Sequence, residues 1–303
     1  MRVSHLFLGV WLLLSAAAGW AVPEGFRTAA GGFAAEMAEK HGFDDAALTA
    51  LMAQARFRQS IIDAMTRPAE SKPWHKYRPI FLTRERADGG VAFWQANQAT
   101  LARAEREYGV PPQIIVAIIG VETKYGRITG SYPVLDALST LAFAYPRRSK
   151  FFRKELEQYL LLTREEGVDP LMPKGSYAGA MGKPQFMPSS YRAYAIDFDG
   201  DGKRDIWHND ADAIGSVANY LKRHGWKPGA SVTHAARARG EVPRRFEAKG
   251  MKPSLRVAEL SRAGLTPVTP LAPETRASLV RLDTPTGAEY WFGLNNFYVI
   301  TRY

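Results

Sequence analysis

The sequence predicts an α+β protein that is mainly helical, with a small β-rich unit near its C-terminal end. Apolar residues recur at three- and four-residue spacing over much of the chain before Trp226, as amphipathic helices require. After Trp226 the helical periodicity weakens, and short strand-like runs bounded by turn residues follow. Apolar residues make up 46% of the chain and charged residues 23%, a balance that is ordinary for a globular fold with a sizeable core.

The first 21 residues predict a signal peptide. Arg2 supplies the positive start, and the apolar run from Leu6 to Ala18 is too short to span a bilayer comfortably. Cleavage is expected after Ala21, with cleavage after Ala18 or an uncleaved anchor as alternatives. We therefore expect an exported, periplasmic protein with no integral membrane span after cleavage. Because the chain has no cysteine, disulfides, thiolate metal sites and a lipid-anchored N-terminus are excluded.

The helical part is predicted to begin with a helical region from Phe26 to Arg67, followed by a polar break from Pro68 to Pro79. Ile114 to Val121 is almost continuously apolar, so β-propensity alone would allow a buried strand. A helix is favoured there because proline, which precedes this run, fits the first helical turn. The predicted helices are Phe93 to Tyr108, Gln113 to Glu122, Leu135 to Tyr145, Lys150 to Glu165 and Ala211 to His224.

The β-rich unit is predicted from two strand-like runs and a turn. Ser278 to Leu282 and Glu289 to Leu294 are the runs, and Thr284 to Gly287 resembles a hairpin turn. A short helical piece is expected from Val257 to Ala263. Phe297 to Tyr303 predicts one more strand.

A carboxyl group ends one of the apolar helices. Residues 120–126 read GVETKYG, with Glu122 at the centre. Desolvation disfavours the charged form of a carboxyl group, so such a Glu is able to hold a proton near neutrality and to protonate a glycosidic oxygen. The alternative is a helix-terminal Glu paired with Lys124 or a nearby arginine.

A loop rich in small residues follows. Residues 175–190 read GSYAGAMGKPQFMPSS. Small residues let a backbone approach a ligand closely, and Ser176 and Gln185 offer hydrogen bonds to a sugar. The alternative is an irregular packed loop that binds nothing.

An acidic loop comes next, and residues 197–205 read DFDGDGKRD. This follows the pattern of a calcium-binding loop, in which oxygen ligands converge on a hard cation. Asp197, Asp199 and Asp201 occupy positions one, three and five. Gly202 permits the sharp turn, and Lys203 is expected to contribute its backbone carbonyl.

The acidic loop departs from the calcium pattern at position twelve, which is His208 rather than Glu. Asp210 or Asp212 is expected to supply the missing carboxylate through a longer loop, and we include Asp212 among the predicted ligands. An acidic turn without metal is the alternative.

Four motifs stand in a specific order: GVETKYG, GSYAGAMGKPQFMPSSY, DFDGDG and DAIGSVANYLKRHGW. With the segments PRRSKFF and NNFYVITRY, the chain resembles the B-type family of lytic murein transglycosylases from about residue 27 to its end. The resemblance implies a lysozyme-like catalytic core (81–226) with an EF-hand-like loop. It also implies an N-terminal helical region (22–80), a small antiparallel β-rich domain (227–294) and a return to the core (295–303).

The resemblance also implies an activity. The family cleaves the β-1,4 bond between N-acetylmuramic acid and N-acetylglucosamine in peptidoglycan without adding water, leaving a 1,6-anhydromuramoyl end. Glu122 matches its catalytic residue, and calcium is implied as a structural ion with no organic cofactor. The residues that match its glycan-contacting or groove-lining positions are Ser176, Gln185, Tyr220, Asn296 and Tyr298.

One carboxyl group is sufficient for this chemistry. Two-carboxylate glycosidases use the second group as a nucleophile or as a base for water. In the reaction implied here, the acetamido group of the substrate replaces the nucleophile, and Glu122 acts first as acid and then as base. A muramidase that uses water and a non-catalytic peptidoglycan-binding protein are the alternative functions.

The net charge of +10 favours an acidic partner, and a solvated surface with an excess of Lys and Arg is the alternative. The Lys and Arg residues are scattered, so an exported protein of this kind is expected to meet cell wall rather than nucleic acid. No H-E-x-x-H pair, P-loop or G-x-S-x-G elbow is present. We expect peptidoglycan strands and wall-remodelling proteins as partners, and a monomer. The family usually continues beyond ITRY with a further helix, so we expect some exposed core surface where this sequence stops.

Overall fold

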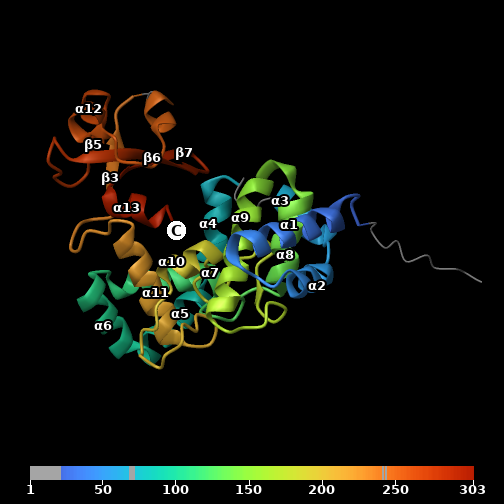
Figure 1. The fold of residues 1–303 in the computed structure, drawn as a ribbon. Helices are drawn as coiled ribbons and strands as arrows, with labels where there is room; N and C mark the ends of the chain where they lie inside the picture. The colour runs from blue at the N-terminus through green and yellow to red at the C-terminus, as the bar shows by residue number, and fades with distance from the viewer. Residues whose placement is uncertain (1–21, 68–71, 241, 243) are drawn as a thin grey trace, which may run out of the picture.

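A computed structural model describes residues 22–67, 72–240, 242 and 244–303, and the predicted signal peptide lies outside the described residues. Thirteen α-helices and two antiparallel sheets make up the described fold (Figure 1), so the prediction of a mainly helical α+β protein is confirmed. No helix in these ranges is long and apolar enough to cross a membrane.

The region predicted to be helical from Phe26 to Arg67 contains three helices. Asp44 starts the second of them by accepting a hydrogen bond from the Ala47 backbone amide, a common helix cap. The helices are α1 (Phe26–His41), α2 (Asp45–Gln54) and α3 (Gln59–Thr66).

The predicted break from Pro68 to Pro79 is wrong in its second half, where α4 spans Trp74–Phe81. Pro73 precedes the helix, and Pro79 lies inside it. An internal proline normally disfavours a helix, but α4 contacts strand β6 (Arg276–Thr284), so tertiary contact outweighs local preference.

The helical body also differs from the sequence prediction at Asn97. The single helix predicted from Phe93 to Tyr108 is wrong, because one helix ends and another begins at this residue. The Asn97 side chain donates to the Phe93 carbonyl, and such local bonds compete with helix continuation. The helices of the body are α5 (Arg84–Ala96), α6 (Gln98–Tyr108), α7 (Pro112–Thr123), α8 (Val134–Ala144), α9 (Ser149–Glu165), α10 (Pro188–Tyr194) and α11 (Asp210–Arg223), with a 3-10 turn η2 (Pro146–Arg148).

The C-terminal part forms a five-stranded antiparallel sheet of order β4-β6-β7-β3-β5. The predicted hairpin is confirmed, since Thr284 pairs with Gly287. The predicted strand from Phe297 to Tyr303 is wrong: it is mostly helix α13 (Asn295–Ile300), whose Val299 is buried. The remaining elements are β3 (Thr233–Ala238), η3 (Arg244–Lys249), β4 (Leu255–Arg256), α12 (Val257–Arg262), β5 (Leu265–Pro267) and β7 (Gly287–Gly293).

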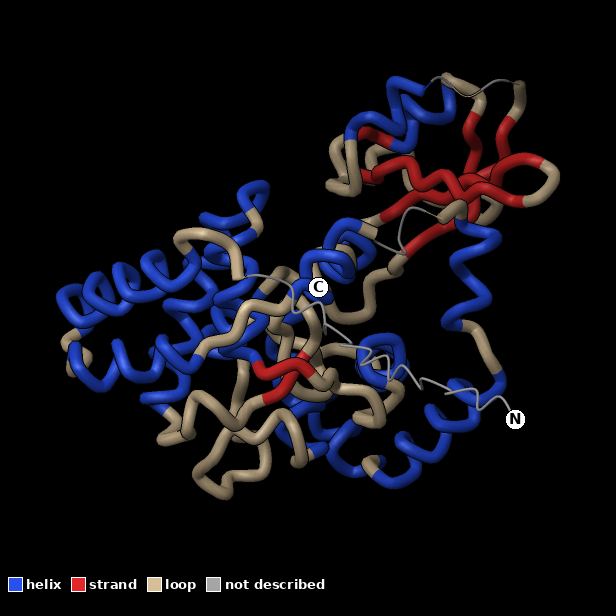
Figure 2. The backbone as a smooth tube through the Cα atoms, turned by 90° about the vertical axis from the view of Figure 1, so that its right-hand side faces the viewer, coloured by secondary structure: helices blue, strands red, loops and turns tan. Residues whose placement is uncertain are grey.

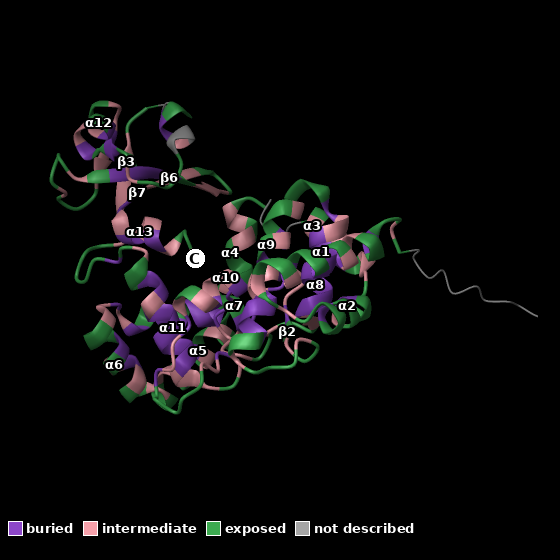
Figure 3. Cartoon of the chain, viewed as in Figure 1, coloured by how far each residue is buried: buried purple, intermediate pink, exposed green. Residues whose placement is uncertain are grey.

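Two hydrophobic clusters hold the molecule together. One runs from Ala30 to Val299 and joins the N-terminal helices to the helical body, while the other lies within the β-rich part, from Val242 to Leu294. Figure 2 shows the sheet to one side of the main group of helices, and Figure 3 shows the buried positions along α7, α8 and α11. In both ribbon views the end of the chain lies between the sheet and the helical body.

Candidate active site

Glu122 lies in the last turn of α7, and the structure confirms that this segment is a helix. The other face of α7 is anchored in the core by Ile115 and Ile119, which are fully buried. The Glu122 side chain is exposed at the surface, yet the protein atoms around its carboxyl group displace part of the nearby water. This desolvation raises the pKa of its carboxyl group from 4.5 to about 7.

The ion pair considered as an alternative is not formed within the described structure. Lys124 instead lies 3.7 Å from Glu85, as does Arg127. Among the described residues no ion pair involves Glu122, so no neighbouring cation holds its carboxyl group in the charged form.

The helix end that carries Glu122 is held from behind by α5. Arg86 donates hydrogen bonds to the carbonyls of Gly120 and Val121 at the end of α7. Tyr125 returns the contact, since its hydroxyl donates to the Arg86 carbonyl at 2.8 Å. A Cβ at Gly120 would lie 2.5 Å from the Tyr125 hydroxyl, so only glycine allows this approach.

Backbone strain gathers in the two predicted motifs. In the described chain the non-glycine residues with positive φ are Lys124, Tyr125 and Gln185. Such conformations cost free energy and persist where surrounding contacts impose them, often at functional sites. Lys124 and Tyr125 lie two and three residues after Glu122, and Gln185 lies in the Gly-rich loop.

Ser176 and Gln185 are both half-buried in the Gly-rich loop. The Ser176 hydroxyl accepts from the amides of Ala178 and Ala180, at 3.2 and 3.1 Å. The Gln185 amide nitrogen donates to the carbonyls of Thr129 and Gly182, both at 3.0 Å. These bonds use the acceptor capacity of the serine and the donor capacity of the glutamine. The serine hydroxyl hydrogen and the glutamine carbonyl oxygen remain for a ligand.

Tyr220 is more deeply buried than a groove-lining residue is expected to be. It is 6% exposed, and its hydroxyl donates to the Arg302 carbonyl. Its ring packs against Tyr303, with ring centroids 4.8 Å apart. Tyr303 in turn lies near Glu122, because the charge of Glu122 adds to the burial that raises the pKa of the Tyr303 hydroxyl.

Asn296 and Tyr298 differ in their access to solvent. Asn296 is fully buried, and its side-chain amide is bonded to the backbone of Lys227 and Ala230. Its side chain therefore has no exposed surface with which to contact a glycan. These bonds tie α13 to the segment before the sheet. Tyr298 is half-buried, and its hydroxyl accepts from Arg302 at 3.2 Å.

The acidic loop brings three carboxylates together. Oxygens of Asp197, Asp199 and Asp212 lie within 4.8 Å of one another. Asp201 and Lys203 are exposed, and the Lys203 amide donates to Asp201. A group of carboxylate oxygens at this spacing suits a hard cation such as calcium.

The structure also distinguishes the two carboxylates considered for the last position. Asp210 is drawn away by an ion pair with Lys183, whereas Asp212 is buried in the cluster. Burial and the charges of Asp199 and Asp197 raise the pKa of Asp212, although two backbone amides oppose the shift. A cation would relieve this repulsion.

Lys183 connects the acidic loop to the helix of Glu122. The Lys183 carbonyl accepts a hydrogen bond from the Thr123 hydroxyl at 3.0 Å. Its amide donates to the carbonyl of Ile206 at 2.9 Å. The loop therefore lies two contacts away from the residue that follows Glu122.

Sequence reasoning missed Arg86 and Tyr303 near Glu122. Arg86 is far from Glu122 in the sequence, and it contacts the end of the Glu122 helix only because α5 packs on α7. Tyr303 stands at the other end of the sequence. The sequence signal for it is the NNFYVITRY segment, in which the family resemblance points to Tyr298 rather than to Tyr303.

A lone carboxyl group of raised pKa on a mainly helical, lysozyme-like body is typical of enzymes that cleave glycans by acid catalysis. The comparisons identify the family. The model of the transglycosylase SLT domain matches residues 25–303. Membrane-bound lytic murein transglycosylase B of Escherichia coli is 49% identical over 281 residues, covering 89% of this chain and 76% of that protein. The chain therefore belongs to the lytic transglycosylase family.

Two solved structures show the same fold. Soluble lytic transglycosylase SltB1 from Pseudomonas aeruginosa has a TM-score of 0.83 and 51% identity, over 90% of this chain and 92% of that one. Escherichia coli lytic transglycosylase Slt35, solved in complex with calcium, has a TM-score of 0.82 and 48% identity, over 90% and 86% of the two chains.

Proposed function

We propose that this lytic transglycosylase cleaves the β-1,4 bond between N-acetylmuramic acid and N-acetylglucosamine and forms 1,6-anhydromuramoyl ends, with Glu122 as its single acid and base. The observation that carries the proposal is the place of Glu122 in the last turn of the largely buried helix α7, with no ion-pair partner among the described residues, where desolvation raises its pKa to about 7. At that value both protonation states are populated near neutral pH, as a group that first donates and then accepts a proton requires.

The steps conserve every atom without water. Glu122 donates its proton to the glycosidic oxygen as the bond between this oxygen and the muramoyl C1 breaks. The acetamido oxygen of the substrate bonds to C1 in place of a protein nucleophile. The Glu122 carboxylate then removes the proton of the muramoyl 6-hydroxyl, whose oxygen bonds to C1. The ring closes, the acetamido group is released, and Glu122 is protonated again.

The absence of a partner carboxylate supports this route over hydrolysis. In a retaining pair the carboxyl groups lie about 5–5.5 Å apart and shift each other's pKa. Within the described residues no carboxylate contributes to the pKa of Glu122, and nearby Glu85 is exposed between two cations.

For glycan contact we propose Ser176, Gln185 and Tyr298, which all keep accessible surface. Tyr220 is proposed to support the site through its packing against Tyr303. Asn296 is proposed to hold α13 in place rather than to touch the glycan.

We propose calcium as a structural ion in the acidic loop, held by Asp197, Asp199 and Asp212, with Asp201 and the Lys203 carbonyl as further predicted ligands. When bound, the ion neutralises repelling carboxylates and orders the loop. Support comes from the carboxylate cluster and from the calcium complex of Slt35. No organic cofactor is proposed.

The proposed location is the periplasm, where peptidoglycan strands and other wall-remodelling proteins would be the partners, and the proposed state is a monomer. The N-terminal sequence supports export.

The test is digestion of purified sacculi by the wild type, E122Q and E85Q, with mass analysis of the products. Wild type and E85Q are expected to release anhydromuropeptides at similar rates, while E122Q loses at least about 10²-fold, the usual effect of a general acid–base group. Products heavier by one water would instead identify a muramidase. Binding without turnover in the wild type would identify a non-catalytic binding protein.

A further inference from the structure

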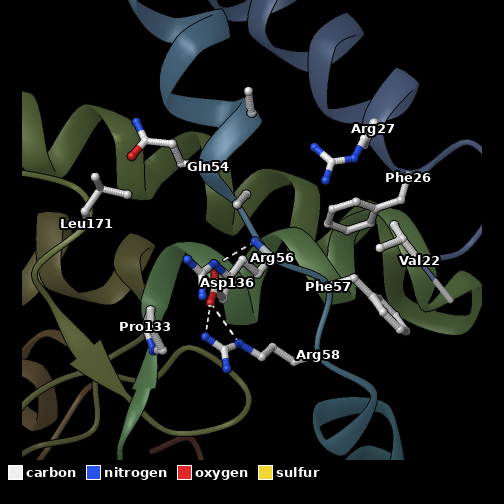
Figure 4. A pocket seen from close by; sticks show the side chains of 12 residues that line it. Val22, Phe26, Arg27, Gln54, Arg56, Phe57, Arg58, Pro133, Asp136 and Leu171 are labelled. Carbon is white, nitrogen blue, oxygen red and sulfur yellow. Dashed lines mark hydrogen bonds and ion pairs between the residues drawn. The ribbon is translucent and has the colours of Figure 1, made fainter. Parts of the chain in front are cut away.

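Arg86 differs from the other half-buried arginines of the described chain, because it has no carboxylate partner. Figure 4 shows the usual arrangement, in which the Arg58 guanidinium donates to the Asp136 carboxylate at 2.7 and 2.9 Å. The remaining pairs are Arg153 with Glu36, Arg192 with Glu165 and Arg204 with Glu166. Burial of an unpaired charge costs free energy, so other contacts must hold the Arg86 guanidinium in place.

The end of α7 supplies these contacts. Nη1 of Arg86 donates to the carbonyls of Gly120 and Val121, the second at 3.1 Å. The last carbonyls of a helix lack partners within the helix and carry its negative partial charge, which a cation stabilises. The Phe81 ring covers the guanidinium, with 5.1 Å between its centroid and Cζ of Arg86. The arginine is therefore fixed at a helix end and under a ring.

The two carbonyls lead directly to Glu122. The Val121 carbonyl belongs to the peptide group whose nitrogen is that of Glu122, and the Gly120 carbonyl belongs to the peptide group before it. Peptide groups are planar, so one guanidinium that holds both of them limits rotation about the backbone bonds that place Glu122. The positive φ angles of Lys124 and Tyr125 also require surrounding contacts to impose them.

Arg86 is itself held from the opposite direction. The Tyr125 hydroxyl donates to the Arg86 carbonyl at 2.8 Å, and the Tyr125 ring stacks on Phe93 with centroids 5.5 Å apart. A Cβ at Gly90 would lie 2.7 Å from the same hydroxyl, so α5 and the end of α7 approach closely. The side chain of Arg86 and the side chain of Tyr125 thus lock the two helices in both directions.

One atom of Arg86 has a cost for stability. Its Nε is buried and has no hydrogen-bond partner in the structure. A buried donor without a partner destabilises the fold, and an arginine kept at this cost is typical of residues that serve a site.

We propose that Arg86 is a positioning residue for glycan cleavage: by holding the Gly120 and Val121 carbonyls, its guanidinium keeps the Glu122 carboxyl group where it reaches the glycosidic oxygen. The inference rests on the proposed function, because it concerns the placement of the proposed acid and base. Arg86 forms no ion pair with Glu122 in the described structure, so it acts through the backbone of α7.

The test compares R86Q, R86K and R164Q with the wild type. R164Q is the matched control, since Arg164 donates to the His41 carbonyl at the end of α1 at 2.9 Å. Its Cζ lies 4.1 Å from the centroid of the Phe43 ring, so it makes the same two kinds of contact at a helix that the site does not use. For each protein we would measure kcat and KM on soluble glycan strands, the pH dependence of kcat, the free energy of unfolding and the product masses.

R86Q is expected to lower kcat about 10²-fold with KM little changed, because a shift of about 1 Å in a catalytic group has an effect of this size. R86K should recover part of the loss, since an ammonium group lacks the fork that reaches both carbonyls. Water admitted around a displaced Glu122 lowers its pKa, so in R86Q the fall of kcat at high pH should begin at a lower pH. R164Q should lose stability only.

An R86Q protein with the kcat and the pH profile of the wild type would overturn the proposal. A loss that only follows the folded fraction, as in R164Q, would overturn it too. If R86Q does not fold, R86K decides, and an R86K protein equal to the wild type in kcat and pH profile sinks the proposal. Products one water heavier from the wild type would overturn the proposed function instead. A lower kcat in R86Q alone would then still support the role of Arg86, because a muramidase also needs a placed acid.

Discussion

Glu122 links catalysis to stability, because burial raises its pKa from 4.5 to about 7. As pH rises from 4.5 to 7, the unfolded chain loses this proton first while the folded chain keeps it. The contribution of the group to stability is therefore complete below pH 4.5 and is lost as pH rises through 7. A glutamine in its place stays neutral and avoids this loss.

We predict that E122Q melts at a higher temperature than the wild type at pH 8, and that the gap narrows at pH 5. Because Glu122 is partly solvated, the expected gain is about 1 kcal/mol or less, or roughly 2–4 °C. Thermal melts of both proteins across this pH range measure it, with E85Q as the control that should show no such trend. A gap that is constant with pH would contradict the raised pKa.

Gly120 is the second residue on which the site depends. A Cβ at this position would lie 2.5 Å from the Tyr125 hydroxyl, so G120A must push apart α7 and the Tyr125 ring. We predict a loss of about 1–3 kcal/mol in the free energy of unfolding, and a lower kcat because Glu122 is displaced. Denaturant melts and turnover assays measure the two effects.

Gly32 provides the control for this substitution. It lies inside α1, where an added Cβ meets nothing within 4 Å, so G32A should stabilise the helix by about 0.5–1 kcal/mol. If G120A behaved like G32A, the close contact with Tyr125 would have no energetic weight.

Among the elements, the acidic loop is the one whose stability we expect to depend on a bound cation. Three carboxylates within 4.8 Å repel one another, and a bound cation removes that cost. We predict that calcium at about a hundredfold excess over its Kd stabilises the wild type by about 2.7 kcal/mol, and that D197N largely loses this response. Calorimetry with calcium and with a chelator measures it. D88N, an exposed carboxylate on α5, should respond like the wild type.

The acidic loop and strand β3 show which structural features the sequence could predict and which it could not. The aspartate spacing from Asp197 to Asp201 predicted a cation loop, but the choice between Asp210 and Asp212 depended on Lys183, which lies in another motif. Strand β3 was missed because Thr233–Ala238 has neither alternation nor β-branched residues beyond its first, and its pairing with β7 decides it.

At the scale of the whole molecule, long-range contacts account for what the sequence could not predict. Tyr303 reaches the Glu122 site through packing on Tyr220, across more than half of the chain. Phe297–Tyr303 has the composition of a strand, yet the buried Val299 and the Asn296 bonds make it a helix against the body. Such outcomes follow from the assembled core, which no local pattern describes.

The two hydrophobic clusters lead to a prediction for the whole molecule. The acidic loop anchors in the larger cluster, where Phe198 and Ile206 are buried, and it contributes no residue to the cluster of the β-rich part. Removal of calcium should therefore speed amide hydrogen exchange in α10 and α11 and leave β6 and β7 unchanged. Exchange measured by mass spectrometry with calcium and with chelator separates the two regions. Equal acceleration in both would show that the clusters open as one cooperative unit.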